Sequence, residues 1–379
     1  MTQQVPVPDG RRLAVESLGD PEGNPVFLLH GTPGGHNGPR PRGIVLYRLG
    51  IRLISYDRPG YADSDRNPDR TVASAAEDVR IIAEYFGLPR FSVVGRSGGA
   101  PHALACAALL PDQVISVAAL GSLAPGDADG LEWMAGMTKS NQDAYGYAQT
   151  DQKALRAMLT EQAERVSKGS GGLLSALWSE MGSHDKEVVD DIALRRIIAH
   201  IHVEALSNNC VDGWMDDVIA LSRPWGFEPA KITVPVKLWG GQDDVFSPIG
   251  HTYWLAERIN GAEVEIGRGK AHFGTVEILP RILAWVARKA NAERPSKLTV
   301  SDGDRRARQL SLAGGRPGQK ADSAARILVV RRRVDRAEQA TSAQGGSHVR
   351  MLGPDQRAKC GEDLLAPPGR ALDSKLLLA

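Results

Sequence analysis

One five-residue segment constrains the fold of this chain more than any other. Residues 95–99 read GRSGG, and they stand between an apolar run at residues 91–94 and a helical pattern at residues 100–110 that stops at Pro111. A serine on a sharp turn between a strand and a helix has its hydroxyl pushed out above the sheet, and glycines beside it let the two elements pack closely. The segment therefore predicts a strand–turn–helix unit with the Ser97 hydroxyl exposed at the edge of a sheet.

The alternative for such a segment is a glycine-rich loop that binds phosphate. Residues 95–99 lack the Lys-Ser/Thr ending of a P-loop and the spacing of a dinucleotide fingerprint. A serine in this position also lies near a helix N-terminus, which favours negative charge nearby. We therefore interpret Ser97 as a nucleophile.

Short apolar runs alternate with longer amphipathic stretches over the first 290 residues. The continuous runs are typical of central strands in a parallel sheet that is covered on both faces. The predicted strands are residues 26–29, 52–56, 91–94, 114–120 and 234–238, the predicted helices are residues 71–86 and 100–110, and residues 5–7 and 13–17 form a hairpin pattern around Pro-Asp-Gly. Strands and helices that alternate in this way predict an α/β fold with a mostly parallel central sheet and helices on both of its faces.

The strand pattern stops between residues 122 and 224. This stretch is helical in pattern, for example over residues 188–206, and strand character returns at Ile232. A helical block between two strands of one sheet is expected to form a cap over the sheet edge. We therefore predict a core domain made of residues 1–121 and 225–291, with residues 122–224 as a helical cap insertion.

The last part of the chain has a different composition. All 20 Phe, Trp and Tyr residues precede residue 292, and residues 292–379 are rich in Arg, Ala, Gly and Ser, with a basic run at residues 331–333. A segment without aromatic residues can bury little apolar surface against its ordering entropy, so we expect residues 292–379 to be disordered. Two further hypotheses are a basic arm for nucleic acid or an acidic partner, and an abnormal C-terminal extension such as a shifted reading frame produces.

Composition restricts the setting in which the protein works. The formal net charge is +1, which gives no reason to expect a nucleic acid or a membrane surface as partner. Three scattered cysteines, Cys106, Cys210 and Cys360, form neither a disulfide framework nor a zinc spacing, and free thiols suit a reducing compartment. No signal peptide and no apolar run near the roughly 20 residues of a membrane span are visible. We expect a cytoplasmic protein whose oligomeric state the sequence leaves open.

A serine nucleophile needs a base, and the base is expected late in the chain, after an acid. Among nine histidines, His272 follows an acid-bearing loop and lies in a turn-like context, whereas His251 falls on an expected helix. His200 and His202 have the wrong spacing for one face of a helix, which argues against a metal site. His102 lies within the helix that follows the turn, where a packed or surface role is expected.

Two adjacent carboxylates compete for the role of the acid. Asp243 and Asp244 follow the strand predicted at residues 234–238, and adjacent side chains point in different directions, so one of the two is expected to reach His272. We favour Asp244 because of its spacing from Gly241 and Pro248, which is taken up below.

Acyl chemistry also needs donors for a developing oxyanion. The backbone N–H after the nucleophile belongs to Gly98, and a second donor is expected from the glycine-rich loop at residues 30–35 (HGTPGG), which follows a central strand. Our candidate is the N–H of Thr32, because Pro33 has no N–H to donate.

Taken together, these segments resemble the α/β-hydrolase superfamily from the first hairpin to about residue 290. Residues 30–35 look like the family's HG-containing oxyanion loop, and residues 56–64 (YDRPGYADS) are similar to its DxxGxGxS loop, with Ala62 where glycine is usual. Residues 95–99 match the nucleophile elbow. Residues 241–248 resemble the GxxD…P acid loop, which carries the acid role onto Asp244, and the surroundings of His272 resemble the histidine loop with Ala271 in place of glycine. In this family the helical insert is a cap over the active site.

The resemblance narrows the chemistry further. Haloalkane dehalogenases and epoxide hydrolases of this fold carry Asp at the elbow and dienelactone hydrolases carry Cys, whereas this chain has Ser97. Proline iminopeptidases share the GG-rich loop, but their elbow is typically GxSWG, and Gly98 stands where that Trp would be. We expect hydrolysis of an ester or similar acyl bond in a small, apolar substrate, through an acyl-enzyme on Ser97, with no cofactor and no metal.

Other functions share the same residues. Carbon–carbon bond hydrolysis, perhydrolysis, aminopeptidase activity and acyl transfer to an alcohol would all use this set of Ser, His and Asp and differ in the pocket. A small-molecule receptor without catalytic activity is the alternative outside enzymes.

Overall fold

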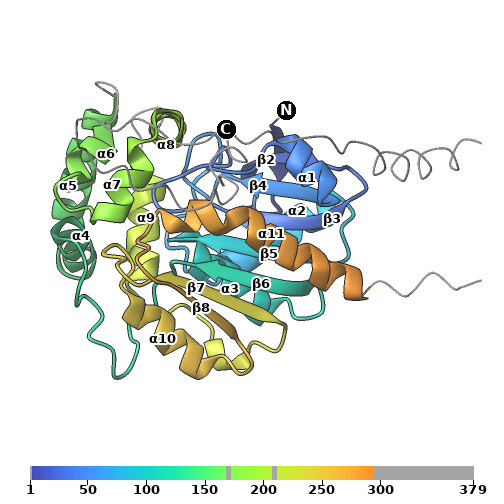
Figure 1. Ribbon diagram of the computed structural model, residues 1–379. Helices are drawn as coiled ribbons and strands as arrows, with labels where there is room; N and C mark the ends of the chain where they lie inside the picture. The colour runs from blue at the N-terminus through green and yellow to red at the C-terminus, as the bar shows by residue number, and fades with distance from the viewer. Residues whose placement is uncertain (1, 168–171, 207–210, 294–379) are drawn as a thin grey trace, which may run out of the picture. The chain divides into compact units, whose positions relative to one another are not determined.

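A mostly parallel sheet forms the centre of the molecule. The computed structural model describes residues 2–167, 172–206 and 211–293. The strands are β1 (Gln3–Pro6), β2 (Arg12–Gly19), β3 (Asn24–Leu29), β4 (Ile51–Tyr56), β5 (Phe91–Arg96), β6 (Val114–Leu120), β7 (Val236–Gly241) and β8 (Glu263–Gly267). Their order across the sheet is β1-β2-β4-β3-β5-β6-β7-β8 (Figure 1). The strand β2 pairs antiparallel with β1 and with β4, and the strands from β3 to β8 run parallel.

Alternate side chains along the central strands face two separate cores. Phe27 and Leu29 of β3 pack with α2 (Ser74–Tyr85) and α3 (Gly99–Leu109), whereas Val26 and Leu28 point to the other face. This alternation follows from the two-residue period of a strand. The second face is covered by α1 (Gly43–Arg48) and the long α11 (Gly274–Glu293), and α10 (Ile249–Arg258) packs beside β7. The predicted fold class, an open α/β sheet with helices on both faces, is confirmed.

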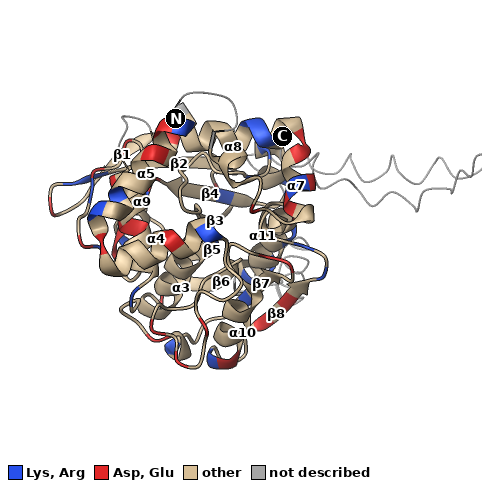
Figure 2. Ribbon diagram, turned by 90° about the vertical axis from the view of Figure 1, so that its left-hand side faces the viewer, with Lys and Arg blue, Asp and Glu red and all other residues tan. Residues whose placement is uncertain are grey.

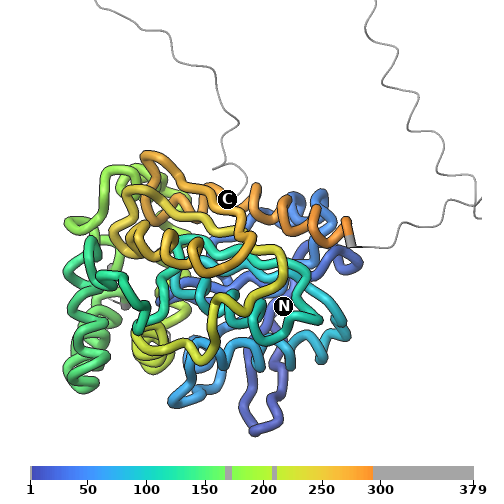
Figure 3. Tube along the Cα trace, turned by 90° about the horizontal axis from the view of Figure 1, so that it is seen from below, coloured from blue at the N-terminus to red at the C-terminus, as the bar shows by residue number. Residues whose placement is uncertain are grey.

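The regular elements that the structure describes between β6 and β7 are all helices. They are α4 (Lys139–Thr150), α5 (Gln152–Ser167), α6 (Gly172–Leu177), α7 (Ser183–Asp190), α8 (Ile192–Ala205) and α9 (Asp212–Leu221), followed by a short 3₁₀ helix, η2 (Pro229–Lys231). These helices pack largely on one another, and Figures 1 and 3 show them gathered on one side of the sheet. We refer to residues 122–224 as the helical insert.

Three local details go beyond the predictions or differ from them. Residues 188–206, which are helical in pattern, belong to two helices, because the Asp191 carboxylate accepts the N–H of Leu194 at 2.9 Å and caps a new helix. The strand predicted at residues 234–238 begins instead at Val236 and runs to Gly241. The edge strand β8 was not predicted, since its burial is partial and its residues form no continuous apolar run.

Parts of the chain fall outside the described residues. The segment predicted to be disordered, residues 292–379, lies outside the described residues except for Ala292 and Glu293, which end α11. Its basic run lies outside them too, and so do Cys210 and Cys360. Cys106 is a buried free thiol. Among the helices that the structure describes, none combines the length and the apolar character that crossing a bilayer requires.

Candidate active site

The loops at the carboxyl ends of four parallel strands bring the predicted site residues together. Ser97 follows β5, and its φ of +51° lies in the left-handed region that non-glycine residues rarely adopt. The elbow is tight, because a Cβ added to Gly95 would stand 2.2 Å from the carbonyl oxygen of Gly99. Thr32 follows β3, Asp244 follows β7 and His272 follows β8. Strand, turn and helix thus hold the serine above the sheet edge, as residues 95–99 predict.

Ser97, His272 and Asp244 form a continuous chain of hydrogen bonds. The Nε2 atom of His272 lies 3.0 Å from Ser97 Oγ, and its Nδ1 lies 2.8 Å from Asp244 Oδ2. With Nδ1–H donating a hydrogen bond to the carboxylate, Nε2 is free to accept the proton of the serine hydroxyl. In sequence, Ser97 and His272 are 175 positions apart, and Asp244 and His272 are 28 positions apart.

The structure separates the two candidate acids. The side chain of Asp244 is 0% exposed, and its second oxygen accepts the backbone N–H groups of Phe246 and Ser247, both at 2.8 Å. Asp243 is exposed and makes no hydrogen bond to His272. The geometry therefore brings Asp244 to the histidine, which is the residue we favoured on sequence.

The surroundings of His272 set its basicity. Burial lowers the pKa of the imidazole, but the charge and hydrogen bond of Asp244 and the charge of Asp185 outweigh that effect, so the pKa is raised above its usual value of 6.5. Arg96 acts in the opposite direction and lowers this pKa. The imidazole thus lies between two carboxylates and one guanidinium.

The loop at residues 30–34 lies against the elbow. A Cβ on Gly31 would be 3.4 Å from Ser97 Cβ, and a Cβ on Gly98 would be 2.2 Å from Thr32 Oγ1. Within the described part of the chain, the N–H groups of Thr32 and Gly98 donate no hydrogen bond to the protein. Two free donors therefore come from neighbouring segments beside the serine, as an oxyanion site requires.

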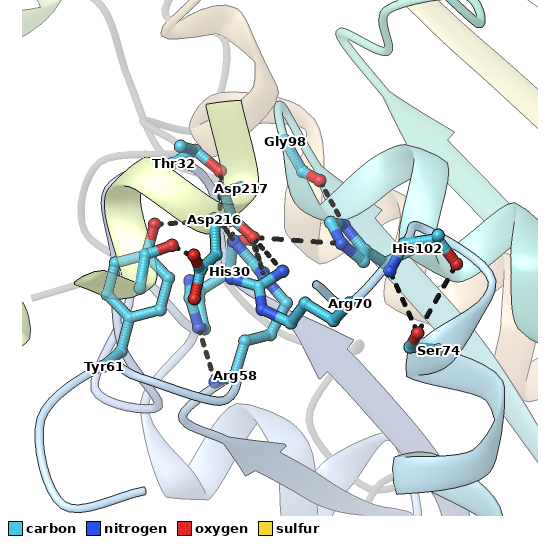
Figure 4. A network of polar contacts seen from close by, with 12 residues as sticks. His30, Thr32, Arg58, Tyr61, Arg70, Ser74, Gly98, His102, Asp216 and Asp217 are labelled. Atoms are coloured by element: carbon cyan, nitrogen blue, oxygen red, sulfur yellow. Dashed lines mark hydrogen bonds and ion pairs between the residues drawn. The ribbon is translucent and has the colours of Figure 1, made fainter. Parts of the chain in front are cut away.

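A buried polar network lies beneath that loop, centred on Asp217 of α9 (Figure 4). Its carboxylate accepts hydrogen bonds from Thr32 Oγ1 at 2.6 Å and from Tyr61 Oη at 2.8 Å. The guanidinium groups of Arg58 and Arg70 pair with it at 2.5 and 2.6 Å. Arg58 also donates to the carbonyl oxygens of residues 30 and 31. The network thus ties the loop at residues 30–34 to a helix of the insert.

The charges of this network are matched inside the protein. Burial raises the pKa of Asp217, yet the charges of Arg58 and Arg70 outweigh it and hold that pKa well below 3.8. His30 stays neutral, because burial and the charge of Arg58 lower its pKa well below 6.5. Its Nε2 accepts the N–H of Arg58 at 3.1 Å, so Nδ1 carries the proton and donates to the carbonyl of Gly31 at 2.7 Å.

The helix α7 holds the backbone on both sides of the catalytic candidate His272. The N–H of Phe273 donates to the Asp185 carboxylate at 2.7 Å, and the N–H of Ala271 donates to His184 Nδ1 at 3.2 Å. The other ring nitrogen of His184 lies 3.1 Å from Glu277 Oε2 of α11. The insert therefore contacts the site through α7 at the histidine loop and through α9 at the loop of residues 30–34.

A cavity of about 170 Å³ opens above Ser97. Ser97, Thr32, Gly98 and His272 line its base, and the insert supplies a largely apolar wall with a few neutral polar groups. Wall residues from the insert include Ser140, Asn141, Met158, Gln162, Leu174, Ile198, His202, Trp214 and Val218. Seen from the insert side, most acidic and basic residues lie on outer helices and loops around a largely uncharged centre (Figure 2).

His251, His102 and His200 make contacts that suit a structural role. His251 Nδ1 accepts the N–H of Ala124 at 3.0 Å, and its other nitrogen lies 2.9 Å from the Trp133 carbonyl oxygen. His102 contacts the Gly98 carbonyl oxygen at 2.7 Å. His200 pairs with Glu204, and His202 lines the cavity. The described residues hold no cluster of three or more His, Cys, Asp or Glu that could bind a metal ion.

Sequence reasoning missed Arg96, Asp185 and Asp217. The first was visible as a charged residue inside the elbow segment, which is a signal in itself. The two aspartates lie on helices of the insert, and their partners are 88 and 159 positions away in sequence. No local sequence pattern predicts contacts between residues so far apart in the chain.

Comparison with known proteins gives two groups of relatives. Proline iminopeptidase from Neisseria gonorrhoeae is 23% identical over 280 residues, which cover 66% of this chain and 84% of that protein. Proline iminopeptidase from Arabidopsis thaliana is 30% identical over 118 residues, and the chain spans only 31% of its length.

The second group consists of solved structures that share the fold. An enol-lactonase from Burkholderia xenovorans superposes with a TM-score of 0.56 at 16% identity, over 76% of this chain and 100% of that one. An esterase from Exiguobacterium antarcticum does so with a TM-score of 0.54 at 19% identity, over 77% and 100%. Residues 24–277 also match the family model described as the alpha/beta hydrolase fold, which is two thirds of the chain. The chain therefore belongs to the α/β-hydrolase fold family.

Proposed function

We propose that this protein is a serine hydrolase that cleaves an ester or similar acyl bond of a small molecule through an acyl-enzyme on Ser97. The observation that carries the proposal is the hydrogen-bonded chain from Asp244 through His272 to Ser97, at 2.8 and 3.0 Å, at the base of a cavity. The free N–H groups of Thr32 and Gly98 beside the serine support it further.

Each residue has one role in the proposed reaction. His272 Nε2 takes the hydroxyl proton as Ser97 Oγ attacks the carbonyl carbon, and Asp244 stabilises the imidazolium that forms. The N–H groups of Thr32 and Gly98 donate to the carbonyl oxygen as it gains charge. His272 then gives its proton to the leaving alcohol, activates a water molecule in the same way, and the water releases the acid from Ser97.

The insert is proposed to shape the substrate pocket as a cap. Its helices supply apolar and neutral polar wall residues, so a small, mainly apolar acyl or alcohol group would be desolvated on binding. Holding Asp217 and Asp185 against the two active-site loops would make the cap a support as well as a wall.

Aminopeptidase activity is the second candidate, because curated relatives are named proline iminopeptidases. Two observations favour ester hydrolysis over it. The described residues that line the cavity include no Asp or Glu that could bind a substrate ammonium group, and they include the cation Arg96. A side chain at Gly98 would also collide with Thr32 Oγ1, so this elbow has no room for the Trp of the GxSWG pattern.

A fluorophosphonate probe and a series of p-nitrophenyl esters test the proposal. We expect the probe to label Ser97, and we expect Ser97→Ala and His272→Ala to lower kcat/KM by on the order of 10⁴-fold or more. Asp244→Asn is expected to cost on the order of 10⁴-fold through loss of the histidine tautomer. Proline p-nitroanilide is the parallel substrate for the second candidate.

Asp243→Asn is the matched control, because its carboxylate is adjacent in sequence but exposed. It is expected to retain activity within about threefold of the wild type. Labelling that persists unchanged in His272→Ala, or turnover of the anilide and of no ester, would overturn the proposal.

A further inference from the structure

A single permanent charge lies in the wall of the cavity. Arg96 ends β5 and precedes Ser97, its residue surface is only 7% exposed, and it lines the same cavity as Ser97 and His272. A Cβ on Gly38, which also lines the cavity, would lie 3.4 Å from Arg96 Nη2, so the guanidinium lies against the loop beyond the oxyanion segment.

The guanidinium has no partner in the described part of the protein. Its side chain makes no hydrogen bond and no ion pair with those residues, and its Nε is buried without an acceptor. Burial lowers its pKa to about 10, and no neighbouring carboxylate opposes that effect. At neutral pH the side chain is still a cation, so the protein keeps a desolvated positive charge without a counter-ion.

Such a charge is costly unless something compensates it. Buried cations in proteins are normally paired or coordinated, because the desolvation of an ion amounts to several kcal/mol. The buried charges of Arg58 and Arg70 in the same molecule are compensated in the usual way, because both side chains pair with the Asp217 carboxylate. The uncompensated charge of Arg96 therefore indicates that its counter-ion is part of the substrate.

The rest of the cavity selects the kind of anion. Apart from Arg96 and the reacting His272, the described lining residues include no Lys, Arg, Asp or Glu, and burial lowers the pKa values of His30 and His202. One guanidinium among neutral donors such as Asn141 and Gln162 suits a group with one negative charge, and the planar fork of arginine fits a carboxylate. A phosphate group with two charges would leave one of them uncompensated.

We propose that Arg96 binds a carboxylate of the substrate, so that the substrates are esters or lactones that carry a free carboxylate close to the scissile carbonyl. This inference rests on the proposed hydrolase function and names the substrate class of the same site. The reaction itself stays the same: Ser97 Oγ bonds to the carbonyl carbon, the carbon–oxygen bond to the alcohol breaks, His272 returns the proton to the alcohol, and water later releases the acid. Arg96 and Ser97 line one cavity of about 170 Å³, so a substrate that contacts both is small and its spacer is short.

Two esters that differ in one charge provide the test. Monomethyl glutarate carries a free carboxylate, whereas dimethyl glutarate is neutral and releases the same alcohol. We expect the wild type to prefer the half-ester in kcat/KM, and we expect Arg96→Met to lower the ratio of half-ester to diester by on the order of 30-fold or more. Arg96→Lys, which keeps the charge but loses the fork, is expected to give an intermediate ratio.

The conditions of the test separate recognition from other effects of the variant. Rates are taken on the plateau of each pH profile, because Arg96 also influences the pKa of His272. Arg80→Met removes the same charge from the surface of α2, where Arg80 pairs with Glu77 and Glu84, and it is expected to keep the wild-type ratio. Monomethyl succinate and monomethyl adipate locate the preferred spacer.

The outcomes distinguish this inference from the proposed function. If both esters are hydrolysed through Ser97 and Arg96→Met leaves their ratio unchanged, the carboxylate site is wrong and the hydrolase stands. If neither ester is hydrolysed and the fluorophosphonate does not label Ser97, the proposed function fails. Calorimetric titration with glutarate then decides the carboxylate site: binding that Arg96→Met abolishes supports it, and no binding to the wild type overturns it.

Discussion

Two buried arginines of this protein have opposite surroundings. Arg58 is 1% exposed, and its guanidinium donates to Asp217, Thr32 and the backbone of the oxyanion loop. Arg96 is 7% exposed and has no protein partner among the described residues. The charge of Arg58 is neutralised on folding and serves the structure, whereas the charge of Arg96 is left uncompensated at the cavity. The difference teaches that the pairing of a buried charge, and not its burial, separates a structural role from a binding role.

Removal of the central anion is expected to have the largest effect on stability. Asp217→Asn leaves Arg58 and Arg70 as buried cations without a counter-ion, and breaking a buried pair in this way costs about 3–5 kcal/mol in the free energy of unfolding. Urea denaturation measures the loss. The expected consequence for catalysis is a lower kcat, because the group that accepts from Thr32 loses its charge and one of its two acceptor oxygens.

Asp216→Asn is the control for this prediction. Asp216 is the preceding residue of α9, but it pairs with Arg66, whose side chain is 36% exposed, so its loss is expected to cost about 1 kcal/mol or less. Equal losses for the two variants would show that the network contributes no more than a surface pair.

The two arginines themselves are expected to respond in different ways to one substitution. Arg58→Met removes several hydrogen bonds and leaves Asp217 with one cation fewer, and we expect a loss of about 3 kcal/mol or more. Arg96→Met breaks no bond within the described protein and relieves an uncompensated charge, so its free energy of unfolding is expected to stay within about 1 kcal/mol of the wild type or to rise.

Thermal and urea unfolding of both variants on the same day would give a direct comparison. Should Arg96→Met prove as unstable as Arg58→Met, the guanidinium of Arg96 has a partner inside the protein and the contrast disappears.

The smallest effect is expected in the pH dependence of catalysis. In the proposed mechanism His272 acts as a base in its neutral form, so kcat/KM for a neutral ester is expected to rise as the pH rises through the pKa of His272. Arg96 lowers that pKa and Asp185 raises it. Arg96→Met is therefore expected to move the rising limb to higher pH, and Asp185→Asn is expected to move it to lower pH.

The pH profiles need only a neutral p-nitrophenyl ester and one control. Arg80→Met removes a charge from the surface of α2 and is expected to leave the rising limb of the pH profile unchanged. Shifts of the same sign in Arg96→Met and Asp185→Asn would contradict the electrostatic explanation.

Much of the fold could be predicted from the sequence because its signals are local. The apolar runs before residues 30 and 97 identified central strands, and the elbow at residues 95–99 identified the carboxyl edge of the sheet. The edge strand β8 escaped because only one side of it faces a neighbour, which weakens its hydrophobic pattern. The break at Asp191 escaped because its capping side chain interrupts no apolar periodicity.

The same difference between local signals and distant contacts applies to the candidate site. Ser97, His272 and Asp244 were named on local patterns, and the structure brings them together. Asp217 and Asp185 act on core loops from distant helices, so their roles depend on how the insert folds back over the sheet. Ala62 shows the limit of pattern matching, since it adopts a φ of +41° at a position where the resembling loops have glycine.

The two hydrogen bonds between α7 and the histidine loop have a consequence for how a substrate could enter. The N–H groups of Ala271 and Phe273 both donate to side chains of that helix, one on each side of His272. An outward movement of α7 would break both bonds and release the segment that carries the base. Entry of substrate by that route would therefore displace the histidine, and return of the helix would restore its position, so that access to the cavity and the placement of the proton acceptor would be coupled through α7.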